Sequence, residues 1–253
     1  MSAPYLSIVI PAHNEENRLP ATLQQVVDFV TRQPYACEVL VVENGSRDRT
    51  WEILQTFTGR YPFVHGLQEQ VPGKGLAVRR GMLAARGAYR FMCDADLSMP
   101  VSEILRFLPP AQSDYDLAIG SREAPGAIRY NEPAYRHWGG RVINGLIRLL
   151  VLPGMQDTQC GFKCFRAEVA ADLFGCQRIP GWAFDIEVLY IARRRGYRIV
   201  EIPIPWHYNP ESKLNIFNDT LQMLRDILRI RRNARLGYYD YHPNPDPGTR
   251  PMA

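Results

Sequence analysis

The sequence lacks a run of apolar residues long enough to cross a membrane, and it shows no secretory leader pattern. A spanning helix needs about 20 consecutive apolar residues, and the longest candidate, 146–155, is interrupted by Arg148 and Pro153. The five cysteines are an odd number without a C-x-x-C pair, so reduced thiols are expected rather than a disulfide framework or a zinc centre. These absences favour a cytosolic protein that at most rests on a membrane surface.

Two glycine-rich nucleotide motifs are also absent. No G-x-x-x-x-G-K-[ST] segment occurs, and no G-x-G-x-x-G follows a strand-like run. P-loop and dinucleotide-cofactor proteins therefore lose support. The net charge is only +4, which does not indicate a nucleic-acid partner.

Strand-like and helix-like segments alternate along the chain. Alternation of this kind predicts an α/β fold with a mostly parallel sheet flanked by helices. The predicted strands are 6–10, 38–42, 63–67, 89–93, 116–120 and 199–204. The predicted helices are 17–30, 49–57, 75–85, 135–152, 184–194 and 214–235. We expect one domain over 1–236, with a nucleotide-binding half (1–120), an acceptor half (121–213) and an amphipathic helix (214–236), and a mobile tail over 237–253.

Polar clusters follow three of the predicted strands. They are residues 11–15, 43–46 and 94–96. Parallel sheets bind ligands beyond the carboxyl ends of their strands. The clusters therefore predict one ligand site built from distant parts of the chain.

Asp94-Ala95-Asp96 is the sharpest of these clusters. Two carboxylates two residues apart after an apolar strand can both reach one divalent cation. Hard oxygen ligands suit Mg²⁺ or Mn²⁺, with diphosphate oxygens and water completing the shell. The alternative is a simple turn, since aspartate is common there.

Glycine, amide and hydroxyl groups offer further ligand contacts. Lys74, between Gly73 and Gly75 at a predicted helix start, suits phosphate, although such a segment is also an ordinary flexible turn. Glu43, Asn44 and Ser46 suit a ribose or a base edge, or else form the turn before the next helix.

Arg122 and the segment 157–163 are the candidates in the second half of the chain. A buried arginine needs an anionic partner, so Arg122 suits a phosphate. Asp157 and Gln159 suit the reacting centre. The alternative for both segments is a polar turn packed on the domain. Asp185 either caps a helix or lines the acceptor side.

In this order, the clusters resemble family 2 glycosyltransferases of the GT-A fold. Residues 8–16, 42–50 and 94–98 resemble the opening strand and nucleotide loop, the second motif and the metal motif of that family. Residues 157–163, 182–187 and 212–214 are most similar to the dolichyl-phosphate β-glucosyltransferase subgroup. Glu43-Asn44 departs from the two aspartates usual in the family. The eukaryotic members carry an N-terminal membrane anchor, which this sequence does not predict.

The resemblance implies transfer of glucose from UDP-glucose to a polyprenyl (dolichyl-type) phosphate with inversion, assisted by Mg²⁺ or Mn²⁺. It implies catalytic roles for Asp94, Asp96, Asp157 and Arg122, with Arg136, Arg141 and Lys213 as further candidates for the acceptor phosphate. The implied metal ligands are Asp94, Asp96 and Ser98. The implied donor-binding set is Pro11, Ala12, Asn14, Glu15, Glu43, Asn44, Ser46, Lys74, Asp94, Ala95, Asp96, Gln159 and Lys213. A GDP-mannose donor, a soluble glycan acceptor, a sugar nucleotidyltransferase and a non-catalytic binding module are the alternatives.

An insoluble acceptor requires contact with a bilayer. The predicted helix 214–235 carries apolar residues at helical spacing, namely Leu214, Phe217, Leu221, Leu224 and Leu228. Its second half holds five arginines against Asp226. The pattern suits an interfacial helix on the cytoplasmic face of a membrane, or equally a surface helix with a solvated basic side.

Overall fold

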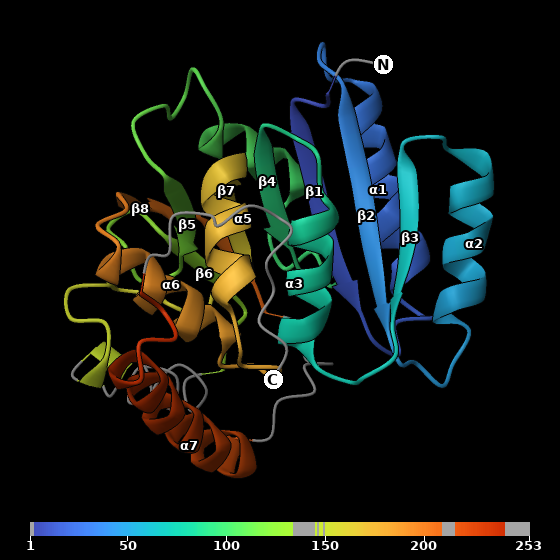
Figure 1. Cartoon of the computed structure of the whole chain (residues 1–253). Helices are drawn as coiled ribbons and strands as arrows, with labels where there is room; N and C mark the ends of the chain where they lie inside the picture. Colours follow the sequence, from blue (N-terminus) through green and yellow to red (C-terminus); the bar gives the residue numbers. More distant parts are fainter. Residues whose placement is uncertain (1–2, 134–144, 146, 149, 209–215, 241–253) are drawn as a thin grey trace, which may run out of the picture.

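A seven-stranded sheet forms the centre of the computed structural model, which describes residues 3–240 apart from 134–144, 146, 149 and 209–215 (Figure 1). Its order is β3-β2-β1-β4-β7-β5-β8, and only β7 runs antiparallel to its neighbours. The strands are β1 (Leu6–Ala12), β2 (Cys37–Asn44), β3 (Val64–Glu69), β4 (Tyr89–Cys93), β5 (Leu117–Ser121), β7 (Phe162–Arg166) and β8 (Ile199–Pro203). A mostly parallel sheet agrees with the predicted fold class.

Helices cover both faces of the sheet. They are α1 (Leu19–Thr31), α2 (Thr50–Arg60), α3 (Lys74–Ala84), α5 (Ala167–Cys176), α6 (Phe184–Arg194) and α7 (Ile216–Arg235), with a 3-10 helix η1 (Val101–Phe107). Alternate residues of β1 pack into two separate hydrophobic cores, because successive side chains of a strand point to opposite faces of the sheet. Ile8 and Ile10 pack in the core that includes α1, and Val9 packs in the core that includes α3, α5 and α6.

Three strands, one α-helix and the 3-10 helix η1 were not predicted from the sequence. β7 follows a polar loop and carries a lysine among apolar residues, so its pattern resembled a turn. α5 directly follows it, without a polar gap that would mark a boundary. The short strands β6 (Ile128–Tyr130) and β9 (Pro205–His207) pair with each other in a small second sheet.

Leu228, a member of the predicted apolar stripe of α7, does not face the core. That side chain is 67% exposed, while Ile227, Ile230 and Ala234 are buried. The inward face is therefore one residue out of phase with the predicted stripe at this position. Leu214 lies outside the described residues, and the side chains of Phe217 and Leu221 are likewise outside the described part of the chain.

The predicted mobile tail is wrong for its first four residues. Tyr239 is fully buried, and its hydroxyl donates to the Glu187 carboxylate at 2.5 Å. The Asn233 amide donates to the same hydroxyl at 3.0 Å. Aromatic burial and two hydrogen bonds therefore fix residues 237–240 on α6 and α7. The remainder of the predicted tail lies outside the described residues.

Candidate active site

The three polar clusters meet at one edge of the sheet. β2, β1 and β4 are adjacent and parallel, so their carboxyl ends lie side by side. Pro11 and Ala12 end β1, Asn44 ends β2, and Asp94 directly follows β4. Figure 1 shows α7 at the same end of the molecule as the arrowheads of β1 and β2. The topology thus brings the three predicted clusters to one edge of the sheet, the edge at which parallel sheets bind ligands.

Lys74 and Asp94 form an ion pair within this edge. The Lys74 Nζ lies 2.7 Å from the Asp94 Oδ1, with the two side chains 16% and 26% exposed. Burial by itself lowers the pKa of Lys74, but the charges of Asp94 and Asp185 outweigh it and raise the pKa overall. The ammonium also lies 4.7 Å from the centre of the Trp182 ring. The Asp94 carboxylate is therefore already paired with a positive charge, the Lys74 ammonium.

Asp96 is held by a hydrogen bond within its own loop. Its Oδ1 accepts a hydrogen bond from the Ser98 amide at 3.0 Å. Burial and the negative charge of Asp94 raise the pKa of Asp96. The Ser98 carbonyl accepts from the His207 amide at 2.8 Å, which ties this loop to β9. The Ala95 carbonyl accepts from the Thr22 hydroxyl at 2.6 Å, which ties it to α1.

A divalent cation fits this pair of carboxylates chemically. A positive charge beside Asp96 would offset the burial and the neighbouring Asp94 charge that raise the pKa of Asp96. Within the described part of the chain, however, no three His, Cys, Asp or Glu side chains gather around one point. A cation held here would complete its shell with other oxygen ligands, such as diphosphate oxygens and water.

Gly161 fixes the position of Asp94. A Cβ at residue 161 would lie only 1.8 Å from the Asp94 Oδ2, and the Asp94 amide donates to the Gly161 carbonyl at 3.2 Å. Only glycine leaves room for the carboxylate. The loop 157–161 thus touches the metal candidate directly, a contact that the sequence did not reveal.

Arg122 and Asp157 pair with each other. The Arg122 Nε and Nη2 donate to the two Asp157 oxygens at 2.6 and 2.9 Å, and the Arg122 amide donates at 3.0 Å. Asp157 is 2% exposed, and the Arg122 guanidinium lies 5.5 Å from the Trp206 ring centre. The predicted phosphate ligand is therefore held by an internal carboxylate, which fixes the direction of its side chain.

The pairing with Arg122 favours the ionised form of Asp157 in the folded protein. Burial alone would raise its pKa, but the Arg122 charge and hydrogen bonds lower it to about 2. A folded pKa below the unfolded value stabilises the protein above about pH 4, and the stabilisation fades as the pH falls toward 2.

We predict that Asp157→Asn lowers the free energy of unfolding most at neutral pH. With an unfolded pKa of about 4 and a folded pKa of about 2, wild type should lose about 1 kcal/mol of this contribution by pH 3. Urea unfolding of both proteins between pH 7 and pH 3 measures the difference. A gap between them that stays constant over this range would contradict the assignment.

The Asn44 side chain shapes the loop before Lys74. Its amide donates to the Val71 carbonyl at 2.8 Å and accepts from the Gly73 amide at 2.7 Å. The Glu43 carboxylate accepts from the Ser46 amide and, at 3.3 Å, from Gln68. Both side chains thus hold loops in the first half of the chain, and direct contact with a ribose or a base remains a prediction.

Asn14 and Glu15 join the first two clusters. The Asn14 amide donates to the Ser46 Oγ at 3.0 Å, and the Asn14 Oδ1 accepts from the Arg47 amide at 2.8 Å. Asn14 has a φ of 52°, a left-handed conformation that asparagine tolerates. The Glu15 amide donates to the Thr50 hydroxyl at 2.8 Å. The nucleotide-loop candidates therefore form one connected network.

Gln159 connects the active-site loop to α7. Its amide nitrogen lies 3.8 Å from the Met223 sulfur, and its backbone amide donates to Asp157 at 3.2 Å. Arg136, Arg141 and Lys213, the other phosphate candidates, lie outside the described residues.

The glycosyl transferase family 2 model matches residues 7–174, which contain all three strand-end clusters, Arg122 and Asp157. The chain belongs to glycosyl transferase family 2. The predicted family is thereby confirmed.

Named relatives of this family 2 chain cover most of its length. A dolichyl-phosphate beta-glucosyltransferase from Dictyostelium discoideum is 32% identical, covering 93% of the chain and 76% of the relative. The Homo sapiens protein of the same name is 33% identical, with coverages of 89% and 74%. The chain therefore spans about three quarters of these relatives.

Solved structures confirm the fold prediction for this family 2 glycosyltransferase. Glucosyl-3-phosphoglycerate synthase from Mycobacterium tuberculosis, in complex with Mn²⁺ and UDP-glucose, superposes with a TM-score of 0.63. It is 17% identical, and the match covers 97% of this chain and 81% of that one. At that identity the likeness concerns the GT-A fold alone.

A buried ion pair lies next to the loop that contacts the metal candidate Asp94. The Lys163 Nζ, 1% exposed with its side chain, lies 2.6 Å from the Asp185 Oδ1. It also donates to the Cys160 carbonyl at 2.5 Å. Neither residue was predicted in this role. The available signal was a single lysine inside the apolar run of β7.

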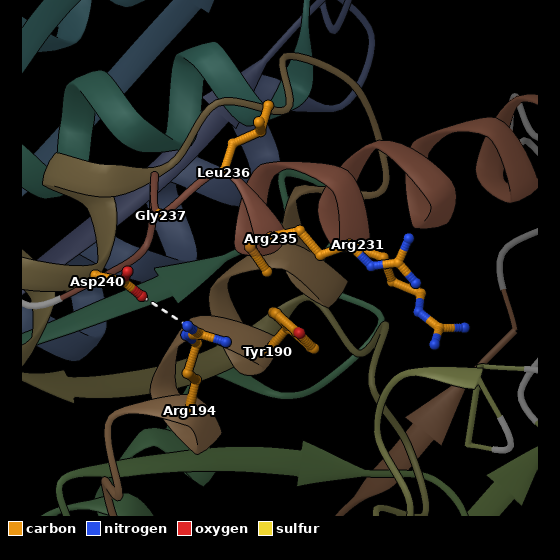
Figure 2. Close-up of a pocket in the computed structure, with 8 residues that line it drawn as sticks. Tyr190, Arg194, Arg231, Arg235, Leu236, Gly237 and Asp240 are labelled. Carbon is orange, nitrogen blue, oxygen red and sulfur yellow. Dashed lines mark hydrogen bonds and ion pairs between the residues drawn. The ribbon is translucent and has the colours of Figure 1, made fainter.

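A separate basic cavity of about 500 Å³ lies between α6 and the end of α7 (Figure 2). Arg194, Arg231 and Arg235 contribute to its lining, and Arg194 pairs with Asp240 at 2.7 Å. None of the predicted donor or metal residues lines it. The cavity therefore belongs to the basic surface of α7 and not to the carboxylate site.

Proposed function

We propose that the protein transfers glucose from UDP-glucose to a polyprenyl phosphate of the dolichyl type, with inversion at the anomeric carbon. The observation that carries this proposal is the convergence of Asp94, Asp96 and Lys74 at the carboxyl edge of the sheet. The relatives named dolichyl-phosphate beta-glucosyltransferase support the same donor sugar and acceptor class.

The donor half would hold the diphosphate. Asp94 and Asp96 would bind Mg²⁺ or Mn²⁺, and a bound cation would stabilise the negative charge of the departing UDP. The neighbouring structure with Mn²⁺ and UDP-glucose supports this combination of ligands. Lys74, at the start of α3, would contact the diphosphate beside the helix N-terminus. The Asn44 side chain would hold the loop that carries Lys74.

The acceptor half needs positioning more than it needs a base. A phosphate monoester has a second pKa of about 6, so its attacking oxygen is largely deprotonated at neutral pH. Arg122, 24% exposed and oriented by Asp157, is our first candidate to hold that phosphate. Because Arg122 lowers the pKa of Asp157 to about 2, Asp157 is a weak base, and we assign it the orientation of the arginine and no role as a base.

A donor panel tests the proposed reaction. UDP-glucose, GDP-mannose and other nucleotide sugars are incubated with polyprenyl phosphate and Mg²⁺, and the intact lipid product is weighed by mass spectrometry. We expect a product heavier by one hexose with UDP-glucose. Transfer from GDP-mannose alone would establish the mannosyltransferase alternative. Pyrophosphate release from a nucleoside triphosphate would indicate a nucleotidyltransferase.

The acceptor's lipid tail requires a membrane contact, for which α7 is our candidate. No described helix is long and apolar enough to span a bilayer. The described outward face of α7 carries five exposed arginines, at 225, 229, 231, 232 and 235, together with exposed Leu228. We therefore propose peripheral binding on the cytoplasmic face of a membrane, through charge rather than deep insertion.

Sedimentation with anionic liposomes measures this contact. Replacing Arg229, Arg232 and Arg235 with glutamine should weaken binding by about 3 kcal/mol, on the order of 100-fold at low salt. The same replacement at exposed Arg32, Arg49 and Arg60 removes equal charge far from α7 and should have little effect. Equal losses in both triple variants, or no dependence on salt, would contradict the assignment.

A further inference from the structure

Lys74 occupies a carboxylate that a divalent cation would also need. Its ammonium lies 2.7 Å from the Asp94 Oδ1. Asp94 has little freedom to turn away, because Gly161 lies against its Oδ2 and accepts from its amide. A cation that binds Asp94 must therefore displace the ammonium.

The backbone of Lys74 is fixed, so only its side chain can move. The Gly75 amide donates to the Pro180 carbonyl at 2.8 Å, and the Gly73 amide donates to Asn44. A Cβ at either glycine would lie 2.5 Å from a carbonyl oxygen of residues 179–180, so the segment is closely packed. The side chain as a whole is 16% exposed, and its ammonium lies beside the Trp182 ring.

An alternative anion is needed before the ammonium leaves Asp94 at low cost. Asp185 adds to the field at Lys74, but it is already paired with Lys163. The diphosphate of a bound donor supplies such an anion next to the start of α3. Displacement without the diphosphate would cost Lys74, whose side chain is only 16% exposed, its close ion-pair partner.

We propose that Lys74 couples binding of the divalent cation to binding of the donor diphosphate. In the empty site the ammonium competes with the cation for Asp94. When the diphosphate is bound, Lys74 pairs with it and Asp94 becomes available. This inference rests on the proposed function, because it requires a nucleotide diphosphate at this edge. Coupling is reciprocal, so the cation must strengthen UDP binding by the same factor.

Manganese binding measured by electron paramagnetic resonance, with and without UDP, tests the coupling. UDP should tighten Mn²⁺ binding in both wild type and Lys74→Met, because UDP oxygens would ligate the metal in each. The tightening should be larger in wild type, because there UDP also draws Lys74 away from Asp94. We expect Lys74→Met to bind Mn²⁺ alone about 10-fold more tightly than wild type, and its gain from UDP to shrink by a similar factor.

The factor by which UDP tightens Mn²⁺ binding, called the UDP gain, distinguishes coupling from simple charge repulsion between Lys74 and Mn²⁺. A lysine that stays in place would weaken Mn²⁺ binding equally with and without UDP, so Lys74→Met would leave the gain unchanged and overturn the proposal. Arg80→Met removes a charge from the same helix, where Arg80 is 3.7 Å from Glu69, and should leave the gain intact. Thermal unfolding verifies that each variant is folded, and Lys74→Arg, which keeps a cation, should retain the wild-type gain.

Failure of the proposed function gives a different pattern. If Asp96→Asn leaves Mn²⁺ binding unchanged, the metal assignment itself is wrong and the coupling falls with it. If Mn²⁺ binding depends on Asp96 but the UDP gain is insensitive to Lys74→Met, only the coupling is overturned.

Discussion

Asp96→Asn is expected to lower kcat/KM for glucosyl transfer by about 10²- to 10³-fold, the loss typical when stabilisation of a developing charge is removed. Asparagine keeps the size of the side chain and can still accept from the Ser98 amide. It loses the negative charge that would hold the cation. Steady-state kinetics with UDP-glucose and polyprenyl phosphate measure the effect.

The thermal stability of Asp96→Asn, unlike its activity, should not fall. The pKa of Asp96 is raised by burial and by Asp94, so its ionised form is unfavourable in the folded protein without a cation. Asp96→Asn should therefore unfold at the same or a higher temperature than wild type in the presence of a metal chelator. Asp28→Asn, at an exposed position of α1, serves as the matched control and should keep full activity. An inactive variant with a lowered unfolding temperature would indicate a structural role instead.

Lys163→Met is expected to lower the free energy of unfolding by about 3–5 kcal/mol, the usual cost of leaving a buried charge without its partner. Asp185, whose side chain is 6% exposed, would lose the ion pair with Lys163. The burial that already raises the pKa of Asp185 would then act without this compensation. Chemical denaturation at neutral pH measures the loss.

The double variant Lys163→Met/Asp185→Asn identifies the source of that loss. Removing both charges should recover much of the stability, because the amide is far cheaper to bury than an unpaired carboxylate. Arg106→Met breaks the more exposed pair with Glu103 and should cost less than about 1 kcal/mol. If the double variant is as unstable as Lys163→Met alone, packing of the lysine chain is responsible and the ion pair is not.

Local sequence pattern was enough to predict the strands β1, β2 and β4 in the first half of the chain. Apolar strands followed by polar clusters predicted β1, β2 and β4, and the observed β4 has the predicted bounds, Tyr89–Cys93. The convergence of Asp94 and Lys74 follows from strand order, since parallel neighbours end at one edge. Periodicity also gave α6 its observed bounds, Phe184–Arg194.

Contacts between distant residues accounted for what the sequence did not predict. β7 is stabilised as a strand by pairing with β4 and β5 on its two sides. This pairing cannot be predicted from the residues of β7 alone. Lys163 is tolerated there because Asp185, 22 residues later, neutralises it. Tyr239 seemed part of a polar tail because its partners, Glu187 and Asn233, lie on other helices.

Anomalous diffraction from crystals grown with Mn²⁺ and UDP tests the central claim most directly. The account predicts a manganese peak in contact with the Asp94 and Asp96 carboxylates and the UDP diphosphate, with the Lys74 ammonium moved from Asp94 to a phosphate oxygen. A manganese peak elsewhere, or UDP bound away from the ends of β1, β2 and β4, would contradict it.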